Sequence, residues 1–378
     1  MADRVDVHTL RHVFGMNRRS PVIESFSRFH FDDGFRDLPR PAGPYPFRLD
    51  LEDVLGQDQV QEIAVRKKMV FHAVGDTGNA KHGAEAQEAI AEHLVRQRED
   101  LAGAEQPLFF YHLGDVVYYN GERRKYEPQF FDPYLLYTAP IFAIPGNHDG
   151  DVLTGDSPLQ GFMENFCSAQ PVHSWMAGQS NRTTMIQPNC YWTLKTPLAS
   201  IIGLYSNVGG MLDGNDRSQE EWLIHELSAA KNDKCVIVAV HHPPYSLDDV
   251  HGGHAPIRES LDRAFVASGR IPNLVLTAHV HDYQRFERDM SGFGGSTLQY
   301  VLAGAGGFAG YSALHQLKES LPNLPAGVRL VKSNTDWPGF LKVTITDSQI
   351  ECTYYTVNQA RQPKDTAVTE FETFQIQL

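Results

Sequence analysis

The sequence predicts an α/β protein, because apolar segments typical of strands alternate along it with segments that have helical spacing. From Lys67 onward these apolar runs are nearly continuous and rich in β-branched and aromatic residues. Strands of this kind are buried on both faces, which requires helices to cover the sheets. The last third of the chain changes to successive strand-like segments, and there we expect antiparallel pairing.

The expected elements follow in chain order after an amino-terminal segment with no sustained period. Residues 1–66 are rich in Pro, Asp and aromatic residues, and we expect an irregular arm of unknown role wrapped over a main domain of residues 67–378. The expected strands are 69–75, 108–114, 141–146, 199–206, 235–242, 273–279, 298–307, 339–357 and 371–378. The expected helices are 84–100 and 218–231.

Two local signals refine this prediction. Ser218 is followed three residues later by Glu221, which is the spacing of a capping box at the start of the second helix. The segment 339–357 is expected to form a hairpin that turns near Thr346-Asp347-Ser348.

Composition excludes several classes of protein. Lys and Arg number 33 against 46 Asp and Glu, a net charge of −13, so a large nucleic-acid interface is not expected, although a small phosphorylated substrate could bind at a locally positive site. The four cysteines lie far apart without CxxC spacing, which argues against a disulfide framework and is compatible with a reducing cytosol. Without an apolar run of membrane-spanning length or a signal peptide, we expect a cytoplasmic protein. The sequence does not indicate an oligomeric state.

Polar side chains follow five of the expected strands. In open α/β sheets, ligands bind outside the carboxyl ends of the strands, so these side chains are expected to gather at one edge. Carboxylate, amide and imidazole groups together form the ligand set of divalent or trivalent metal ions. The residues are Asp76, Asp115, Asn147, His148, His241, His279 and His281.

Each of these motifs has a structural alternative when it is taken alone. A Gly-Asp pair after a strand commonly forms a turn, and His241-His242 could be two hydrogen-bonded core histidines. The pair His279 and His281 points to one face of an extended segment, a pattern that also arises by chance. The occurrence of all five motifs at strand ends favours a metal site.

In their order along the chain, these motifs resemble those of the calcineurin-like metallophosphoesterase superfamily, and in detail its purple acid phosphatase branch. The resemblance covers roughly residues 67–357, and Ala278 is the one departure, since the family has glycine there. It implies a four-layer α/β/β/α sandwich of two mixed β-sheets flanked by helices, with residues 67–378 as the catalytic domain. The matching segments are Asp76-Thr77-Gly78, Gly114-Asp115-Val116-Val117-Tyr118, Gly146-Asn147-His148-Asp149, His241-His242-Pro243 and Ala278-His279-Val280-His281.

One difference within the superfamily concerns Gly78 and Tyr118. Most members have a histidine two residues after the first Asp, where this chain has Gly78. The resemblance implies that Tyr118, three residues after Asp115, replaces the lost ligand; aromatic packing at the sheet edge is the alternative. A phenolate is a hard anionic donor, so this exchange favours Fe(III).

The resemblance implies two metal ions and a hydrolytic reaction. Fe(III) would be held by Asp76, Tyr118 and His281. A divalent ion, Fe, Zn or Mn, would be held by Asn147, His241 and His279. Asp115 would bridge the two ions, and a hydroxide generated by them would attack phosphorus in line.

The resemblance also implies residues that contact the substrate without binding metal. His148 is expected to protonate the leaving group, with Asp149 orienting it. His251 and His254 are rivals for a second histidine that contacts phosphate, and a surface-loop role remains open for either.

The expected activity is therefore hydrolysis of small phosphate monoesters. A phosphodiesterase acting on small diesters, such as cyclic nucleotides or phospholipid headgroups, is the alternative within enzymes. A non-catalytic binding scaffold is less favoured, because such proteins lose ligands and all seven expected ligands are present here.

Overall fold

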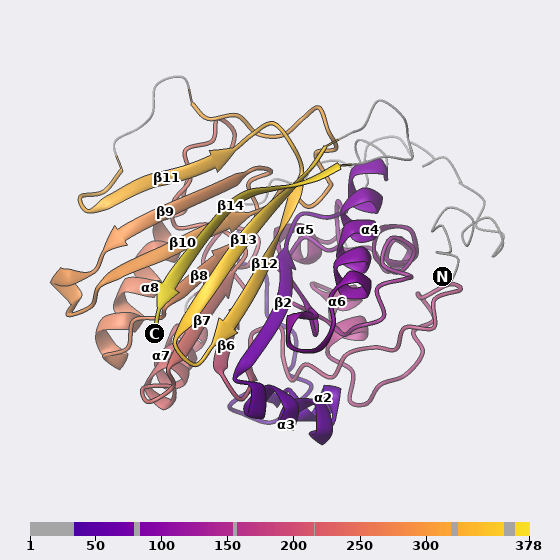
Figure 1. Ribbon diagram of the computed structural model, residues 1–378, viewed down its shortest axis with the longest axis horizontal. Helices are drawn as coiled ribbons and strands as arrows, with labels where there is room; N and C mark the ends of the chain where they lie inside the picture. The colour runs from indigo at the N-terminus through magenta and orange to yellow at the C-terminus, as the bar shows by residue number, and fades with distance from the viewer. Residues whose placement is uncertain (1–33, 79–83, 154–156, 215, 319–323, 359–366) are drawn as a thin grey trace.

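The computed structural model describes residues 34–378 except 79–83, 154–156, 215, 319–323 and 359–366 (Figure 1). Within the described residues, an eight-stranded sheet has the order β1-β5-β6-β7-β8-β10-β9-β11, and a six-stranded sheet has the order β14-β13-β12-β2-β3-β4. Both sheets mix parallel and antiparallel pairs. The predicted α/β fold, with two mixed sheets flanked by helices, is confirmed.

The strands of the eight-stranded sheet are β1 (Arg48–Asp50), β5 (Trp192–Lys195), β6 (Ala199–Leu204), β7 (Cys235–Val240), β8 (Leu274–Thr277), β9 (Tyr283–Asp289), β10 (Thr297–Ala303) and β11 (Val328–Asn334). Those of the six-stranded sheet are β2 (Lys68–Val74), β3 (Phe110–His112), β4 (Ile141–Ala143), β12 (Gly339–Thr346), β13 (Gln349–Asn358) and β14 (Ala367–Gln377). The α-helices are α2 (Glu52–Leu55), α3 (Gln57–Arg66), α4 (Glu85–Asp100), α5 (Asn147–Gly150), α6 (Gln160–Phe166), α7 (Ser218–Ala229) and α8 (Ala255–Ser268).

The core lies between the two sheets, as the apolar strands require. Strands β6, β7 and β8 are buried along their whole length, and so is β2 apart from its first residue. Aromatic rings join the sheets: Tyr111 of β3 stacks on Trp192 of β5 at 6.1 Å, and Tyr283 of β9 stacks on Tyr354 of β13 at 3.9 Å. Burial of such large rings stabilises the packing of one sheet on the other.

The carboxyl-terminal strands follow the prediction in part. Strands β12 and β13 form the predicted hairpin, which turns between Thr346 and Gln349, and β14 continues it. Strand β10, however, belongs to the other sheet, where it runs parallel to β8 and antiparallel to β9. The expected run of successive antiparallel strands is therefore divided between two sheets.

The amino end of α7 differs from the predicted capping box. Ser218 is the first residue of the helix and makes no capping hydrogen bond. The carboxylate of Asp213 instead accepts the backbone N–H of Gln219 at 2.7 Å and of Glu220 at 2.9 Å. A residue outside the four-residue motif thus satisfies the first donors of the helix.

Part of the segment expected to be an irregular arm is regular. β1 pairs in parallel with β5, and α2 and α3 follow it before β2 begins. The guanidinium of Arg48 forms an ion pair with the buried Glu226 of α7 at 2.8 Å. Residues 1–33 lie outside the described residues, and the role of the whole segment stays a prediction.

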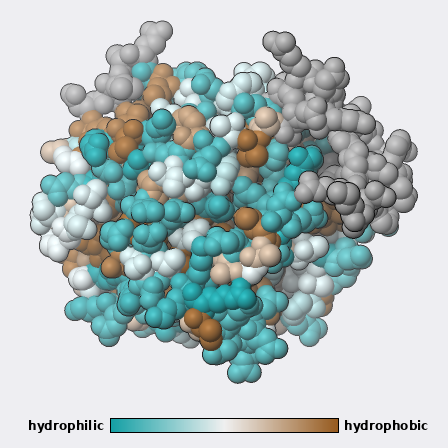
Figure 2. Space-filling view, in the orientation of Figure 1, coloured by the Kyte–Doolittle hydropathy of each residue, from teal (hydrophilic) through white to brown (hydrophobic). Residues whose placement is uncertain are grey.

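The surface in Figure 2 is largely hydrophilic, with hydrophobic residues scattered among polar ones. In the described part of the chain, no helix is long and apolar enough to cross a membrane. The four cysteines are unpaired and buried.

Candidate active site

The candidate site forms where strands of both sheets end side by side. β2, β3 and β4 run parallel in one sheet, and β7 and β8 run parallel in the other, so their carboxyl ends point to the same edge. Backbone hydrogen bonds continue beyond the strands, from the N–H of Asp76 to the carbonyl of Gly114 at 3.0 Å and from Ala278 to His241 at 2.9 Å. The loops that carry the polar residues are therefore fixed to one another.

Three of these residues have a backbone conformation that is costly for a side chain. The φ angle is 56° at Asp76, 53° at Asp115 and 71° at His279. Positive φ in residues other than glycine is uncommon and is concentrated at functional sites. Each of the three follows a strand by two or three residues, so the strain lies in the loops that present side chains to the site.

A first group of donor atoms surrounds the Oδ1 atom of Asp76. The Tyr118 hydroxyl lies 2.9 Å from this oxygen, and Nε2 of His281 lies 3.6 Å from it. The hydroxyl and Nε2 are 3.4 Å apart. Because metal–ligand bonds of about 2.0–2.2 Å place neighbouring donors roughly 3–3.5 Å apart, this group has the spacing of a metal site.

A second group surrounds the Oδ1 atom of Asn147. Nδ1 of His279 lies 2.9 Å from it and Nε2 of His241 lies 3.2 Å from it. Oδ2 of Asp115 is 3.3 Å from Nε2 of His241. Asp115, His241 and His279 can each offer one atom within a sphere suitable for an ion.

Neighbouring groups orient these donors. Nδ1 of His241 donates to the carbonyl of Leu113 at 2.8 Å, which directs Nε2 into the site. The backbone N–H of His279 donates to Oδ2 of Asp76 at 2.7 Å, leaving Oδ1 for the first group. Such outer hydrogen bonds fix the tautomer and direction of metal ligands.

The electrostatics of the site fit cation binding. Burial raises the pKa of Asp76 well above its usual range, and burial with two carboxylates nearby raises that of Tyr118. Burial also opposes the charged forms of His241 and Asp115. Nevertheless, Asp115 and Asp76 raise the pKa of His241 to about 9, and His241 lowers the pKa of Asp115. The carboxylates that favour a proton on His241 would equally favour a metal ion bound by the same residues.

The structure also explains why Gly78 and Tyr118 occur together. A Cβ atom at position 78 would lie 2.5 Å from the Tyr118 ring and 2.7 Å from the Gln129 side chain. Gln129 holds the Tyr118 backbone with two hydrogen bonds, and Phe308 stacks on the Tyr118 ring at 3.8 Å. A side chain at position 78 and the tyrosine therefore compete for the same space.

His148 lies beside the first group, but Asp149 does not orient it as expected. The Asp149 carboxylate accepts the backbone N–H groups of Val116, Val117 and Gly146. Nδ1 of His148 instead donates to the carbonyl of Tyr119 at 2.8 Å, which leaves Nε2 as its second nitrogen. The expected orientation of His148 by Asp149 is therefore not seen, because loop amides occupy the Asp149 carboxylate, and a role of Asp149 in catalysis stays a prediction.

The rival histidines both reach the site. The ring of His251 lies 4.3 Å from that of His279, and the ring of His254 lies 5.2 Å from it. Two further histidines are present that the motifs did not assign to the site. His242 packs 4.1 Å from His279, and His315 packs 4.4 Å from His281. His315 stands in no motif, so no sequence signal pointed to it.

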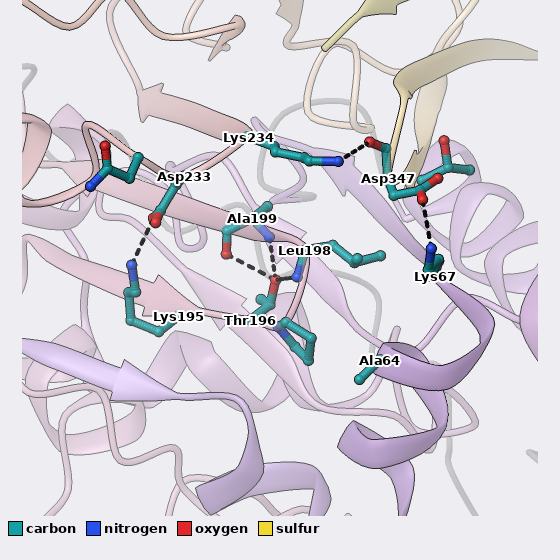
Figure 3. Close-up of a pocket in the computed structure, with 12 residues that line it drawn as sticks. Ala64, Lys67, Lys195, Thr196, Leu198, Ala199, Asp233, Lys234 and Asp347 are labelled. Carbon is teal, nitrogen blue, oxygen red and sulfur yellow. Dashed lines mark hydrogen bonds and ion pairs between the residues drawn. The ribbon is translucent and has the colours of Figure 1, made fainter.

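A separate pocket of about 500 Å³ lies near the opposite ends of the strands (Figure 3). It is lined by the residues before β6 and β7 and by the turn after β12. Four of its five charged groups are paired, Lys67 with Asp347 at 3.1 Å and Lys195 with Asp233 at 2.8 Å, and Lys234 donates to the backbone carbonyl of Asp347 at 3.1 Å. With most of its charges already paired, this pocket is a poorer candidate site than the histidine cluster.

Comparison with known proteins identifies a family for most of the chain after the amino-terminal segment. The family model for calcineurin-like phosphoesterases matches residues 69–283, more than half of the chain. The chain belongs to the calcineurin-like phosphoesterase family. This membership indicates metal-dependent hydrolysis of a phosphoester, and the family usually binds two metal ions.

Solved structures of the same fold are distant in sequence. GAP50, the anchor in the inner membrane complex of Plasmodium, has a TM-score of 0.56 and 15% identity, over 82% of this chain and 89% of that one. PhoD has a TM-score of 0.54 and 14% identity, over 82% of this chain and 70% of that one. At these identities the likeness shows the fold alone. A comparison with curated protein sequences finds no match.

Proposed function

We propose that the protein is a phosphate monoesterase of the purple acid phosphatase type with two metal ions. The observation that supports this most directly is the position of Tyr118, whose hydroxyl lies 2.9 Å from Asp76 in the first donor group. The second group, with Asn147 and two imidazoles, lies beside it, since Nε2 of His241 is 4.0 Å from Oδ1 of Asp76. The buried Asp115 contacts both His241 and Tyr118. The site thus offers two adjacent sets of donors with an anionic residue between them.

The ligand assignment follows the two groups. Asp76, Tyr118 and His281 would hold Fe(III), since a phenolate oxygen and a carboxylate suit a trivalent ion. Asn147, His241 and His279 would hold a divalent ion, Fe, Zn or Mn, with Asp115 shared. When bound, two such ions supply Lewis acidity to the phosphoryl oxygens and lower the pKa of water for attack on phosphorus.

His148 is placed to serve the leaving group. Its backbone N–H donates to Oδ1 of Asp115 at 2.9 Å, so the residue is fixed at the edge of the donor groups. With Nδ1 donating to Tyr119, a proton on Nε2 can be passed to the departing oxygen. His251 and His254, around His279, would contact the remaining phosphoryl oxygens.

The test combines metal analysis with paired substrates. The metal-loaded protein is expected to contain about two metal ions per chain, one of them iron, and to hydrolyse 4-nitrophenyl phosphate faster than bis(4-nitrophenyl) phosphate. Asp115→Asn should lose metal and more than about 100-fold in kcat/KM, because it weakens both groups at once. Asp58→Asn, on the exposed surface of α3, is the matched control and should change neither.

Two outcomes would contradict the proposal in different ways. Faster hydrolysis of the diester would show a phosphodiesterase built on the same site. A protein that takes up no transition metal and hydrolyses neither ester would indicate the binding scaffold.

A further inference from the structure

We propose that His315, held by Asp248, is a substrate-contacting residue that accepts, at Nε2, a hydrogen bond from a protonated oxygen of the phosphoryl group. This inference rests on the proposed function, and it adds a residue and its supporting carboxylate outside the family motifs. His315 comes from the segment after β10 and lies outside residues 69–283.

The first observation is the position of the ring. Ring centroids of His315 and His281 are 4.4 Å apart, those of His315 and His251 are 5.1 Å apart, and His251 lies 4.3 Å from His279. The backbone N–H of His315 donates to the carbonyl of His281 at 3.2 Å. His315 therefore stands in the same wall of imidazoles as two expected ligands and an expected phosphate contact.

The second observation is the hydrogen bonding of Asp248. This carboxylate is fully buried and receives the backbone N–H of His251 at 2.9 Å and of Gly252 at 2.7 Å. Oδ2 of Asp248 lies 3.1 Å from Nδ1 of His315. Although burial opposes the charge, these donors lower the pKa of Asp248 below its usual range, so the carboxylate is ionised.

An ionised, buried carboxylate determines the tautomer of His315. The N–H of His281 also points to Nδ1, but from 3.4 Å. The shorter contact with a charged acceptor is the stronger one, so Nδ1 carries a proton and donates to Asp248. Among the described residues, none hydrogen-bonds Nε2 of His315, and the side chain is 10% exposed, so Nε2 is available to accept a hydrogen bond from a protonated phosphate oxygen.

The two loops that carry these residues are joined. The N–H of Asp249 donates to the carbonyl of Gln316 at 2.8 Å, and that of Lys318 donates to Leu247 at 2.9 Å. The side chain of Gln284 in β9 accepts the N–H of Leu247 at 2.9 Å, which ties the pair to the strand after His281. Asp248 is therefore a positioning residue that orients both His251 and His315 on a fixed support.

Two variants separate contact with substrate from support of the loop. Asn reproduces the position of Nδ1 in histidine, and Gln reproduces that of Nε2. His315→Asn should keep the bond to Asp248 but weaken inorganic phosphate binding by about 10- to 100-fold, the effect of losing a hydrogen bond to a charged group. His315→Gln should retain most of the affinity.

The measurement is calorimetric titration of the metal-loaded protein with inorganic phosphate, alongside KM and kcat on 4-nitrophenyl phosphate and metal content. KM is expected to rise in His315→Asn while metal content stays at that of the parent. His225→Ala, a histidine on α7 whose side chain is 48% exposed, is the control and should behave as the parent.

The outcomes distinguish this inference from the proposed function. A parent that binds metal and hydrolyses the ester, with His315→Asn equal to it in phosphate affinity and KM, would overturn the contact and leave the function standing. Loss of metal or of folding in both variants would show that His315 is structural. A parent that binds neither metal nor phosphate would overturn both.

Discussion

At the scale of single residues, Tyr118 is held in place by contacts that need no metal. Gln129 fixes its backbone and Phe308 stacks on its ring, so the hydroxyl points to Asp76 from a rigid support. Burial and nearby carboxylates raise the pKa of this phenol, so ionisation requires a compensating cation. A phenolate at this position is thus a reporter of the metal.

The corresponding prediction is a visible charge-transfer band from Tyr118 to Fe(III). Tyr118→Phe should remove the band in the iron-loaded protein, because only the ligating oxygen is lost. Tyr119→Phe is the matched control and should keep it. Absorption spectra with iron analysis provide the measurement, and a full band in Tyr118→Phe would exclude this tyrosine as the ligand.

A second prediction at this scale concerns His148. A proton donor matters most when the leaving group is a poor one, so His148→Ala should slow an alkyl phosphate by about 10²–10⁴-fold. A nitrophenyl phosphate, with its acidic phenol, should be slowed much less. Rates on both esters, with metal content as the control, test this, and equal loss on both would indicate phosphate binding instead.

The sequence indicated which residues gather because each one follows a strand whose direction the α/β pattern determines. Their roles as ligands stay a prediction. Two details could not be read in the same way. Asp149 is adjacent to His148 in sequence, yet its partners are amides from the loop after β3 and from Gly146. His315 reaches the site through a long-range pair with Asp248, which no local spacing encodes.

At the scale of elements, the segment before β2 is attached through β1. Arg48 pairs with Glu226 of α7, whose side chain is only 2% exposed and also accepts the Thr193 hydroxyl at 2.7 Å. β1 itself was not predicted, because three residues with an alternating burial pattern give too short a signal. The same limit applies to the cap of α7, since Asp213 lies outside the spacing of a capping box.

This attachment gives a stability prediction. Arg48→Ala should lower the free energy of unfolding by about 1–3 kcal/mol, because it leaves a buried carboxylate without its charged partner. Arg96→Ala, which removes an exposed pair with Glu92 on α4, should change it by about 0.5 kcal/mol or less. Urea unfolding of the three proteins measures the difference, and equal effects would show that β1 is not held by this pair.

At the scale of the whole molecule, an acidic chain must attract an anionic substrate. The net charge of −13 opposes the approach of phosphate, and the described site adds buried carboxylates of its own. Two bound cations with a total charge of about five would reverse the local sign against Asp76, Asp115 and a Tyr118 phenolate. Substrate attraction would therefore depend on metal ions held by the donor groups where both sheets end.

Metal binding should accordingly stabilise the whole fold. A ligand that binds only the folded protein adds about 2.7 kcal/mol at a hundredfold excess over its Kd, so chelation of the metals should lower the Tm by several degrees. Returning iron and zinc should restore it. In Asp115→Asn the difference between metal-loaded and chelated protein should shrink to less than half, because both donor groups lose the residue they share, whereas Asp58→Asn should retain it in full. Thermal melts of the three proteins with and without chelator provide the measurement, and a Tm that does not respond to metal in the parent would contradict a binuclear centre at these strand ends.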